Sequence, residues 1–221
     1  MKKSIAVIGL SRFGLNLVED FSKLNVDIIA IDHNKENVVK ASEFVHNVIV
    51  ADSTNIDALK EAGIGNVDSV IVAIGQNNPA NLATSIITII KLKQLGIIDI
   101  TARADDKDSA EALKLVGATN IVLPLNIASE RIAYKISSLD LVDYFNIKGD
   151  FSVAEIKVSK DFIKTAIIDL NIRNTYNLNI LLIERKGSII VPDKDTIIEP
   201  NDEVFVFGRR KDIPKISNLL T

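Results

Sequence analysis

The sequence predicts an α/β protein, with a parallel sheet in its first two thirds and a smaller α+β domain in its last third. Three observations predict this. Over residues 4–136, short apolar runs alternate with amphipathic stretches, which is typical of βαβ units. The first apolar run, residues 5–8, leads directly into a segment bounded by two glycines. From residue 154 onward, apolar and charged residues alternate one by one, as in antiparallel strands that are buried on one face.

Six apolar runs are the strand candidates of the first domain. They are residues 5–8, 28–31, 47–50, 69–73, 99–102 and 121–123. Between these runs apolar residues recur at helical spacing, as Phe13, Leu17 and Phe21 do. Because the strands are apolar throughout, helices are expected to cover both faces of the sheet. The first domain is therefore predicted to be a Rossmann-type, doubly wound parallel sheet.

A change of pattern near residue 140 predicts the start of the second domain. A helical stripe continues past the sixth strand to Leu139 and then breaks, so we expect domains at residues 1–139 and 140–221. The expected elements of the second domain are strands at residues 154–158, 179–184, 188–191 and 203–207, a hairpin turn at 185–187 and a helix at 212–220.

The composition excludes several kinds of protein. A net charge of −3 and a pI near 5.5 argue against nucleic acid as the main partner, because duplex binding needs a basic face. The absence of cysteine excludes disulfides and thiol chemistry. The longest apolar region, residues 82–98, contains Lys91 and Lys93 and is shorter than the ~20 residues of a membrane span. Since Arg12 also interrupts the first apolar stretch too early for a signal peptide, we expect a cytoplasmic protein without direct membrane insertion.

The most informative motif runs from Gly9 to Gly14 and reads Gly-Leu-Ser-Arg-Phe-Gly. A strand that ends in such a turn and opens a helix presents backbone N–H groups and a positive helix end at one point, which is a phosphate site. Asp32 ends the second strand 18 residues after Gly14, where a ribose-binding carboxylate is expected. Ser11 stands where a dinucleotide-binding fingerprint has its middle glycine. The alternative is a packing turn that binds no ligand.

Several short segments together resemble the cytosolic regulators of potassium conductance, most closely the subunits of Ktr and Trk transport systems. These segments are residues 7–14, 31–32, 51–54, 72–75 and 117–118 in the first domain and 167–173 and 200–202 in the second, so the resemblance covers the whole length. It implies a non-enzymatic regulatory subunit that gates a membrane-embedded potassium transporter or channel. It also implies a homo-oligomer built from dimers, namely an octameric ring that reaches the membrane only through its partner.

The resemblance implies a site for ATP or ADP in the first domain, with NAD or NADH as the alternative ligand. The turn residues Gly9, Ser11, Phe13 and Gly14 would surround the phosphates, and the guanidinium of Arg12 would reach the terminal ones. Asp32 would accept the ribose hydroxyls and would repel the 2′-phosphate of NADP. The other candidates are Asp52 and Ser53 at the adenine edge, Ala73, Ile74 and Gly75 in the pocket wall, and Arg103 as a second phosphate contact. The alternative for Asp52 is an N-cap of the following helix.

The second domain resembles the family's C-terminal domain, which in several relatives binds cyclic di-AMP at a dimer interface. The matching residues are Ile167, Ile168, Asp169, Arg173, Asn179, Ile180 and Pro192. A symmetric ligand on a two-fold axis needs an apolar surface for adenine and a cation for phosphate, which the two isoleucines and Arg173 offer. The alternative is that Ile167 and Ile168 belong to the core and that Arg173 pairs with Asp169.

No metal site is expected. In family members that hold a divalent cation at the nucleotide site, an acidic residue follows the proline after the sixth strand. Here Leu125 follows Pro124, and neither Asn126 nor Ile127 supplies a carboxylate for a hard cation. The two histidines, at positions 33 and 46, show no metal-ligand spacing.

Two other classes of protein remain as alternatives. An NAD-dependent oxidoreductase would share the glycine turn and Asp32, but it also needs an acid/base group near the nicotinamide, and the sequence suggests none. A nucleotide-sensing transcription factor would need a DNA-reading helix and a basic face, and neither is visible. The sequence therefore favours a non-enzymatic regulator.

Overall fold

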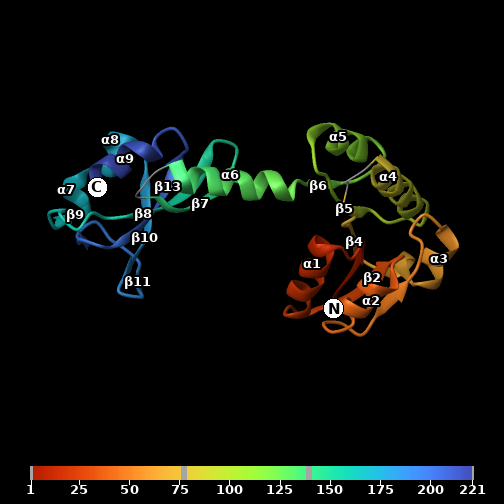
Figure 1. Cartoon of the computed structure of the whole chain (residues 1–221). Helices are drawn as coiled ribbons and strands as arrows, with labels where there is room; N and C mark the ends of the chain where they lie inside the picture. Colours follow the sequence, from red (N-terminus) through yellow and green to blue (C-terminus); the bar gives the residue numbers. More distant parts are fainter. Residues whose placement is uncertain (1, 76–78, 138–140, 221) are drawn as a thin grey trace. The chain divides into compact units, whose positions relative to one another are not determined.

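The protein divides into two compact units. The structure, a computed structural model, describes residues 2–75, 79–137 and 141–220 (Figure 1). The first unit is Met1–Leu125 and the second is Asn126–Thr221. The boundary that the sequence predicts between residues 139 and 140 lies outside the described residues, as does Leu139, the predicted end of the helical stripe. Among the described residues, none of the helices meets the length and hydrophobicity that a transmembrane span requires.

The first unit is built on a six-stranded parallel sheet with the order β3-β2-β1-β4-β5-β6. Its strands are β1 (Lys3–Ile8), β2 (Val26–Asp32), β3 (Val48–Val50), β4 (Ser69–Val72), β5 (Asp99–Arg103) and β6 (Asn120–Val122). All six predicted strands are confirmed, and their order is that of a Rossmann-type sheet. The order reverses between β1 and β4, so the carboxyl ends of these two strands flank a crevice where ligands bind in such sheets.

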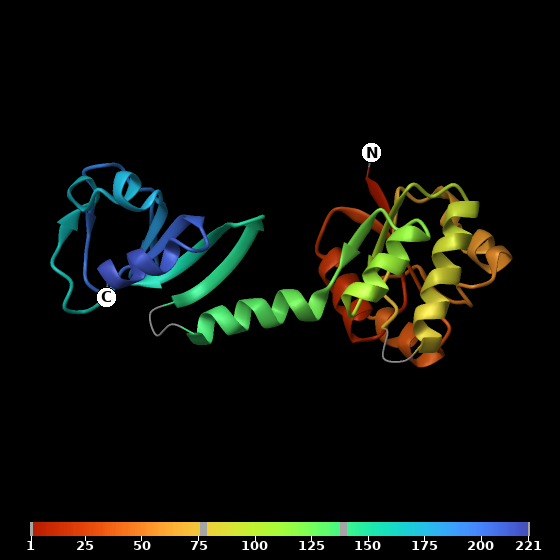
Figure 2. The ribbon, with the colours of Figure 1, turned by 90° about the horizontal axis from the view of Figure 1, so that it is seen from above.

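Helices cover both faces of this sheet, as the apolar strands predict. They are α1 (Arg12–Ser22), α2 (Lys35–Ala41), α3 (Ile56–Glu61), α4 (Pro79–Gln94) and α5 (Lys107–Leu115), with a short 3-10 turn, η1 (Ile64–Asn66). Neighbouring residues of β1 face opposite cores. Val7 packs in one core with Val18 of α1 and Ala41 of α2. Ile8 packs in the other with Leu92 of α4, where α4 and α5 lie side by side (Figure 2).

The second unit contains a five-stranded antiparallel sheet with the order β11-β10-β13-β8-β7. Its strands are β7 (Leu141–Lys148), β8 (Phe151–Lys157), β10 (Asn179–Arg185), β11 (Ser188–Ile190) and β13 (Glu203–Arg209). A separate pair joins β9 (Thr165–Ala166) to β12 (Ile197–Ile198). The helices are α6 (Pro124–Ser137), α7 (Ile167–Leu170), α8 (Ile172–Tyr176) and α9 (Ile213–Leu220). The α+β class, the β10–β11 hairpin and the last helix are confirmed.

The core of the second unit lies on one face of the antiparallel sheet. Ala154, Ile156 and Val206 point to this face and are fully buried. Helix α9 packs on β8 and β13, and Tyr134 of α6 stacks on Tyr144 of β7 with ring centroids 4.3 Å apart. Figure 2 shows β7 and β8 as a long twisted hairpin. Strand β7 was not among the predicted elements.

Candidate functional site

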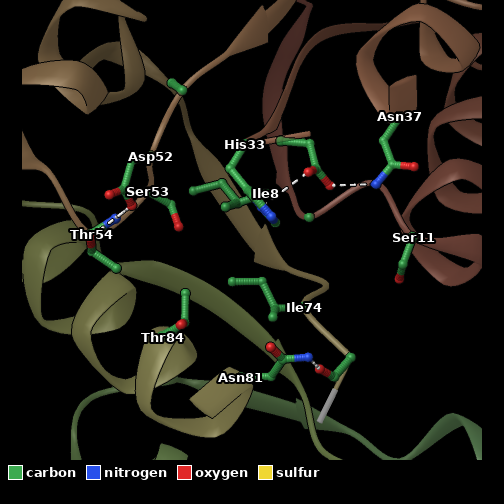
Figure 3. A pocket seen from close by; sticks show the side chains of 14 residues that line it. Ile8, Ser11, His33, Asn37, Asp52, Ser53, Thr54, Ile74, Asn81 and Thr84 are labelled. Atoms are coloured by element: carbon green, nitrogen blue, oxygen red, sulfur yellow. Dashed lines mark hydrogen bonds and ion pairs between the residues drawn. The ribbon is translucent and has the colours of Figure 1, made fainter. Parts of the chain in front are cut away.

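A cleft lies at the carboxyl edge of the parallel sheet, at the point where the strand order reverses. Its volume is about 470 Å³. The ends of β1, β2 and β4 form its floor, the loop of residues 51–54 forms one wall, and Asn81 and Thr84 of α4 form another (Figure 3). Residues far apart in sequence therefore meet at the place where a Rossmann-type sheet binds its ligand.

The glycine turn allows two backbone segments to approach very closely. Gly9 has a φ of +94°, and a Cβ placed on it would lie 2.9 Å from the backbone nitrogen of Ile74. A Cβ placed on Gly14 would lie 1.8 Å from the carbonyl oxygen of Gly9. Helix α1 starts immediately after Ser11, whose side chain makes no capping hydrogen bond among the described residues. The first turn of α1 therefore keeps the uncapped N–H groups that bind an anion.

Asp32 holds this turn in place. Its carboxylate is 6% exposed and accepts hydrogen bonds from the backbone N–H of Leu10 at 2.6 Å and of Asn34 at 2.7 Å. Two longer contacts of 3.3 Å come from Nδ2 of Asn37 and from Nδ1 of His33. Both backbone bonds are short, and the bond from Leu10 fixes the glycine turn. The two longer side-chain contacts are weaker, and ribose hydroxyls can replace them without disturbing the backbone.

The loop of residues 51–54 is held by a different carboxylate. Oδ1 of Asp52 accepts from the backbone N–H of Thr54 at 2.9 Å and from its hydroxyl at 2.7 Å, and these bonds lower the pKa of Asp52. The N-cap of α3 is Asn55, whose side chain accepts from the backbone N–H of Asp57 at 2.9 Å. The N-cap interpretation of Asp52 is therefore wrong, because Asn55 fills that position. Ser53 is buried and bonds to Oγ1 of Thr88 at 2.8 Å, which ties the loop to α4.

The predicted site residues fall into two groups in the structure. Those that line the cleft are Gly9, Ser11, Asp32, Asp52, Ser53, Ile74 and Gly75. Those that lie outside its lining are Arg12, Phe13, Gly14, Ala73 and Arg103. Arg12 is exposed at the start of α1, and Ala73 extends the β1–β4 ladder through a bond from its N–H to the carbonyl of Ile8.

Arg103 lies close to the glycine turn although it does not line the cleft. Its guanidinium pairs with Asp105 at 2.9 Å and lies 5.5 Å from the ring centroid of Phe13. A Cβ placed on Gly75 would lie 3.4 Å from Nη1 of Arg103. Arg103 therefore places a positive charge beside α1 and the end of β4. This charge is paired with the carboxylate of Asp105.

Seven lining residues were not among the predicted site residues: Ile8, His33, Asn37, Ala51, Thr54, Asn81 and Thr84. Asn37 lies in the first turn of α2, and Asn34 is the N-cap of this helix. Asparagine is a common N-cap residue, so a helix predicted to start there would have placed Asn37 near the end of β2. Asn81 donates from Nδ2 to the carbonyl of Gly75 at 2.7 Å and so fastens α4 to the end of β4. No local pattern marks Asn81, because its role depends on the tertiary position of α4.

A second cavity, of about 320 Å³, lies in the second unit beside α7, α8 and the start of β10. Six of the seven predicted residues line it: Ile167, Ile168, Arg173, Asn179, Ile180 and Pro192. Asp169 is not among its lining residues. Ile168 is 53% exposed, and among the described residues Arg173 forms no ion pair with Asp169. The alternative of a core isoleucine pair beside an Arg173–Asp169 ion pair therefore fails for Ile168 and for the ion pair, whereas Ile167 does pack against the core.

Comparisons with known proteins identify the family. The TrkA-N domain matches residues 5–124 and the TrkA-C domain matches residues 153–221. The chain is 35% identical over 216 residues to the Ktr system potassium uptake protein C of Bacillus subtilis (strain 168), an alignment that covers 97% of this chain and 96% of that protein. The chain belongs to the Ktr/Trk family of regulators of potassium conductance.

Other relatives agree with this Ktr/Trk assignment. The Ktr system potassium uptake protein A of the same organism is 31% identical over 217 residues, covering 98% of this chain and 96% of that protein. The structure of the GsuK channel bound to NAD aligns with a TM-score of 0.67 at 18% identity. The alignment covers 100% of this chain and 40% of that channel chain. That likeness shows a shared fold.

The position after Pro124, where the resemblance would place an acidic residue in a metal-binding member, is Leu125 in this chain. Pro124 begins α6, and Leu125 behind it is 61% exposed. Among the described residues, no group of three or more His, Asp or Glu side chains is placed to hold a metal ion.

Proposed function

We propose that this chain is a non-enzymatic regulatory subunit that binds ATP or ADP in its first unit and thereby gates a membrane-embedded potassium transporter or channel. The observation that supports this most directly is the cleft itself, which combines the uncapped start of α1 with the carboxylate of Asp32, bonded to Leu10 of the glycine turn. A nucleotide phosphate fits the first and a ribose the second. The assignment to potassium transport comes from the family to which the chain belongs.

The order of the groups in the cleft suggests how the nucleotide lies. The phosphates would lie at Gly9 and Ser11, with Arg12 folding over the terminal one. The ribose hydroxyls would replace Asn37 and His33 on Asp32. The adenine would then reach the loop of residues 51–54, where Asp52 lies. Ser11 adds a hydroxyl donor that a glycine there would lack.

The lining of the cleft favours a sensor over an enzyme. The described lining residues include His33 as their one imidazole and contain no lysine or tyrosine. His33 lies at the ribose end, and its side chain is 86% exposed. An oxidoreductase needs a positioned acid/base group at the nicotinamide, at the far end of its cofactor.

The second cavity would bind cyclic di-AMP. It combines the apolar side chains of Ile167, Ile180 and Pro192 with the exposed guanidinium of Arg173, which suits an adenine and a phosphate. Binding of either ligand would change the conductance only if the ligand prefers one state of the oligomer over another. We expect that oligomer to be an octameric ring of dimers on the cytoplasmic side of the membrane.

Calorimetry of the full chain with ATP, ADP, NAD, NADH and cyclic di-AMP tests this proposal. We expect saturable binding of ATP and ADP that is at least tenfold tighter than that of NAD or NADH, and separate binding of cyclic di-AMP that adds to the ATP signal. Potassium flux in vesicles that carry the partner transporter should then differ between ATP and ADP. Tight binding of NAD alone, or flux that ignores both nucleotides, would contradict the proposal.

A further inference from the structure

Ser11 is the point at which the glycine turn departs from a dinucleotide-binding fingerprint, which has a glycine there. Ser11 is the N-cap of α1, it is exposed, and it lines the cleft. Its side chain makes no capping hydrogen bond among the described residues. In Figure 3 it lies across the cleft from Asp52, near which the adenine is proposed to bind. Its hydroxyl is therefore available to a ligand at the phosphate end.

The backbone around Ser11 is held so closely that it cannot move back to make room for a ligand. A backbone N–H of the turn is bonded to Asp32 at 2.6 Å. A Cβ on Gly9 would lie 2.9 Å from the backbone nitrogen of Ile74, and a Cβ on Gly14 would lie 1.8 Å from the carbonyl oxygen of Gly9. The Cβ and hydroxyl of Ser11 therefore occupy space in front of the turn that a glycine would leave to the ligand.

The ribose end of the cleft cannot distinguish a mononucleotide from a dinucleotide. ATP, ADP and NAD all carry an adenosine whose ribose has free 2′ and 3′ hydroxyls, and the carboxylate of Asp32 suits each of them. The loop of residues 51–54 likewise faces the same adenine in every case. Selection among these ligands must therefore come from the phosphate end or from the space beyond it.

The phosphates of the two ligand classes differ in their freedom to move. The pyrophosphate of a dinucleotide is joined to a ribose at both ends and must lie across the glycine turn, close to its backbone. The phosphate chain of ATP or ADP has one free end. It can shift by the width of the Ser11 side chain and accept a hydrogen bond from its hydroxyl, which the phosphate charge strengthens. A bridging pyrophosphate cannot shift in this way without moving both nucleosides.

Side chains beyond the turn add to the same preference. A dinucleotide carries its second half across the point where the strand order reverses, over β4 and β5. There Arg103 pairs with Asp105, their side chains are 14% and 17% exposed, and the guanidinium reaches to 5.5 Å from the ring centroid of Phe13 on α1. A Cβ on Gly75 would lie 3.4 Å from Nη1 of Arg103, and Asn81 bonds to the carbonyl of Gly75 at 2.7 Å. A second nucleoside would have to displace this ion pair.

We propose that Ser11 makes the cleft select a nucleotide with free terminal phosphates and discriminate against adenine dinucleotides. Its Cβ keeps a bridging pyrophosphate away from the backbone of the turn, and its hydroxyl donates to a phosphate oxygen of ATP or ADP. The inference rests on the proposed function, since it concerns the same cleft. It assigns the preference for ATP or ADP over NAD to one side chain.

Calorimetry of the full chain carrying Ser11→Gly tests this inference. Removing the side chain should tighten the binding of NAD and NADH about tenfold or more, because a single methylene group in a packed site changes affinity by that amount. The same change should weaken the binding of ATP and ADP about threefold to tenfold, because a hydrogen bond to a charged phosphate is lost. The quantity compared between variants is the ratio of the Kd for NAD to the Kd for ATP.

A second variant separates the two parts of the side chain. Ser11→Ala keeps the Cβ and removes the hydroxyl, so it should bind NAD as weakly as the wild type does while losing as much ATP affinity as Ser11→Gly. Ser42→Gly is the matched control. Ser42 is exposed at the end of α2, its hydroxyl donates to the carbonyl of Val39, and it does not line the cleft. This control should bind every nucleotide as the wild type does.

The outcomes separate this inference from the proposed function. A wild-type chain that binds neither ATP nor ADP would contradict the proposed function. If the wild type binds ATP and Ser11→Gly keeps the wild-type ratio of the two Kd values, the role of Ser11 alone is wrong. Tight NAD binding by Ser11→Ala as well as by Ser11→Gly would show that the Cβ does not exclude the dinucleotide, which would overturn the steric argument.

Discussion

At the scale of single residues, Asp32 combines two roles that are usually considered separately. It is expected to bind ribose, and it also accepts the N–H of Leu10 at 2.6 Å and so shapes the phosphate turn. Asp32→Ala should weaken ATP binding at least tenfold and also lower the free energy of unfolding by about 1–3 kcal/mol, because the buried N–H of Leu10 and the part-buried N–H of Asn34 lose their acceptor. Calorimetry and urea denaturation measure the two effects.

Asn37→Ala is the control for this variant. Asn37 contacts Asp32 at 3.3 Å through its side chain alone, so its removal should leave stability within about 0.5 kcal/mol of the wild type. If Asp32→Ala changes binding without changing stability, the bond to Leu10 does not hold the turn.

Gly14 allows a second test at the residue scale. A Cβ there would lie 1.8 Å from the carbonyl of Gly9, so Gly14→Ala forces the start of α1 away from the turn. We expect a loss of about 1–3 kcal/mol in stability and of most ATP affinity. Gly65→Ala is the matched control, because a Cβ at Gly65 meets nothing within 4 Å. Nucleotide binding that survives in Gly14→Ala would place the phosphates elsewhere.

At the scale of elements, one ion pair joins α6 to the edge strand β7. Nε of Arg131 donates to Oδ1 of Asp143 at 2.7 Å, and this pairing lowers the pKa of Asp143 to about 2. Since the folded pKa is below the ordinary value, the stability that this pair contributes is present above about pH 4 and is lost as the pH falls toward 2.

Asp143→Asn should therefore remove part of the acid sensitivity of the second unit. In urea denaturation at pH 6 and pH 3, the stability difference between the two pH values should be smaller in this variant than in the wild type. Asp150→Asn, an exposed carboxylate in the β7–β8 turn, should behave as the wild type does. An unchanged difference in Asp143→Asn would show that the pair does not hold α6 to the sheet.

The elements also show which structural features a sequence can predict. The parallel strands were predictable because strands buried on both faces are continuous apolar runs, as residues 28–31 are. Strand β7 was missed because it is an edge strand with Asp143, Asn146 and Lys148 in a region that looks like a polar linker. The short helices α7 and α8 were missed because each is followed by an asparagine at positive φ, Asn171 and Asn177, so neither is long enough to show a helical period.

Part of the candidate site was predictable because some of its residues belong to a local sequence motif. Gly9, Gly14 and Asp32 belong to a local motif whose spacing is fixed by one strand, one turn and one helix. Asn81 acts through the position of α4 against β4, which only the assembled sheet provides. The residues of the second cavity were placed through resemblance alone, and their convergence depends on the packing of α7 and α8 beside β10.

At the scale of the whole molecule, two ligand sites on one chain require separate tests. Arg173→Ala in the full chain should weaken cyclic di-AMP binding at least tenfold and leave ATP binding unchanged. Arg173 lines the second cavity and does not line the cleft of the first unit. Stability without ligand should be unaffected, since an exposed arginine contributes little. Lys186→Ala, at the exposed β10–β11 turn, is the control. Wild-type affinity in Arg173→Ala would remove this arginine from the site.

The bond from Leu10 to Asp32 also has a consequence for the speed of signalling. Because the protein's own carboxylate orders the turn, nucleotide entry does not have to fold a loop first. Association should then be limited by diffusion and orientation, with a rate constant of about 10⁶ M⁻¹s⁻¹ or more. At millimolar nucleotide an empty site would refill in about a millisecond, so the release of the old nucleotide would set how quickly the chain follows the energy state of the cell.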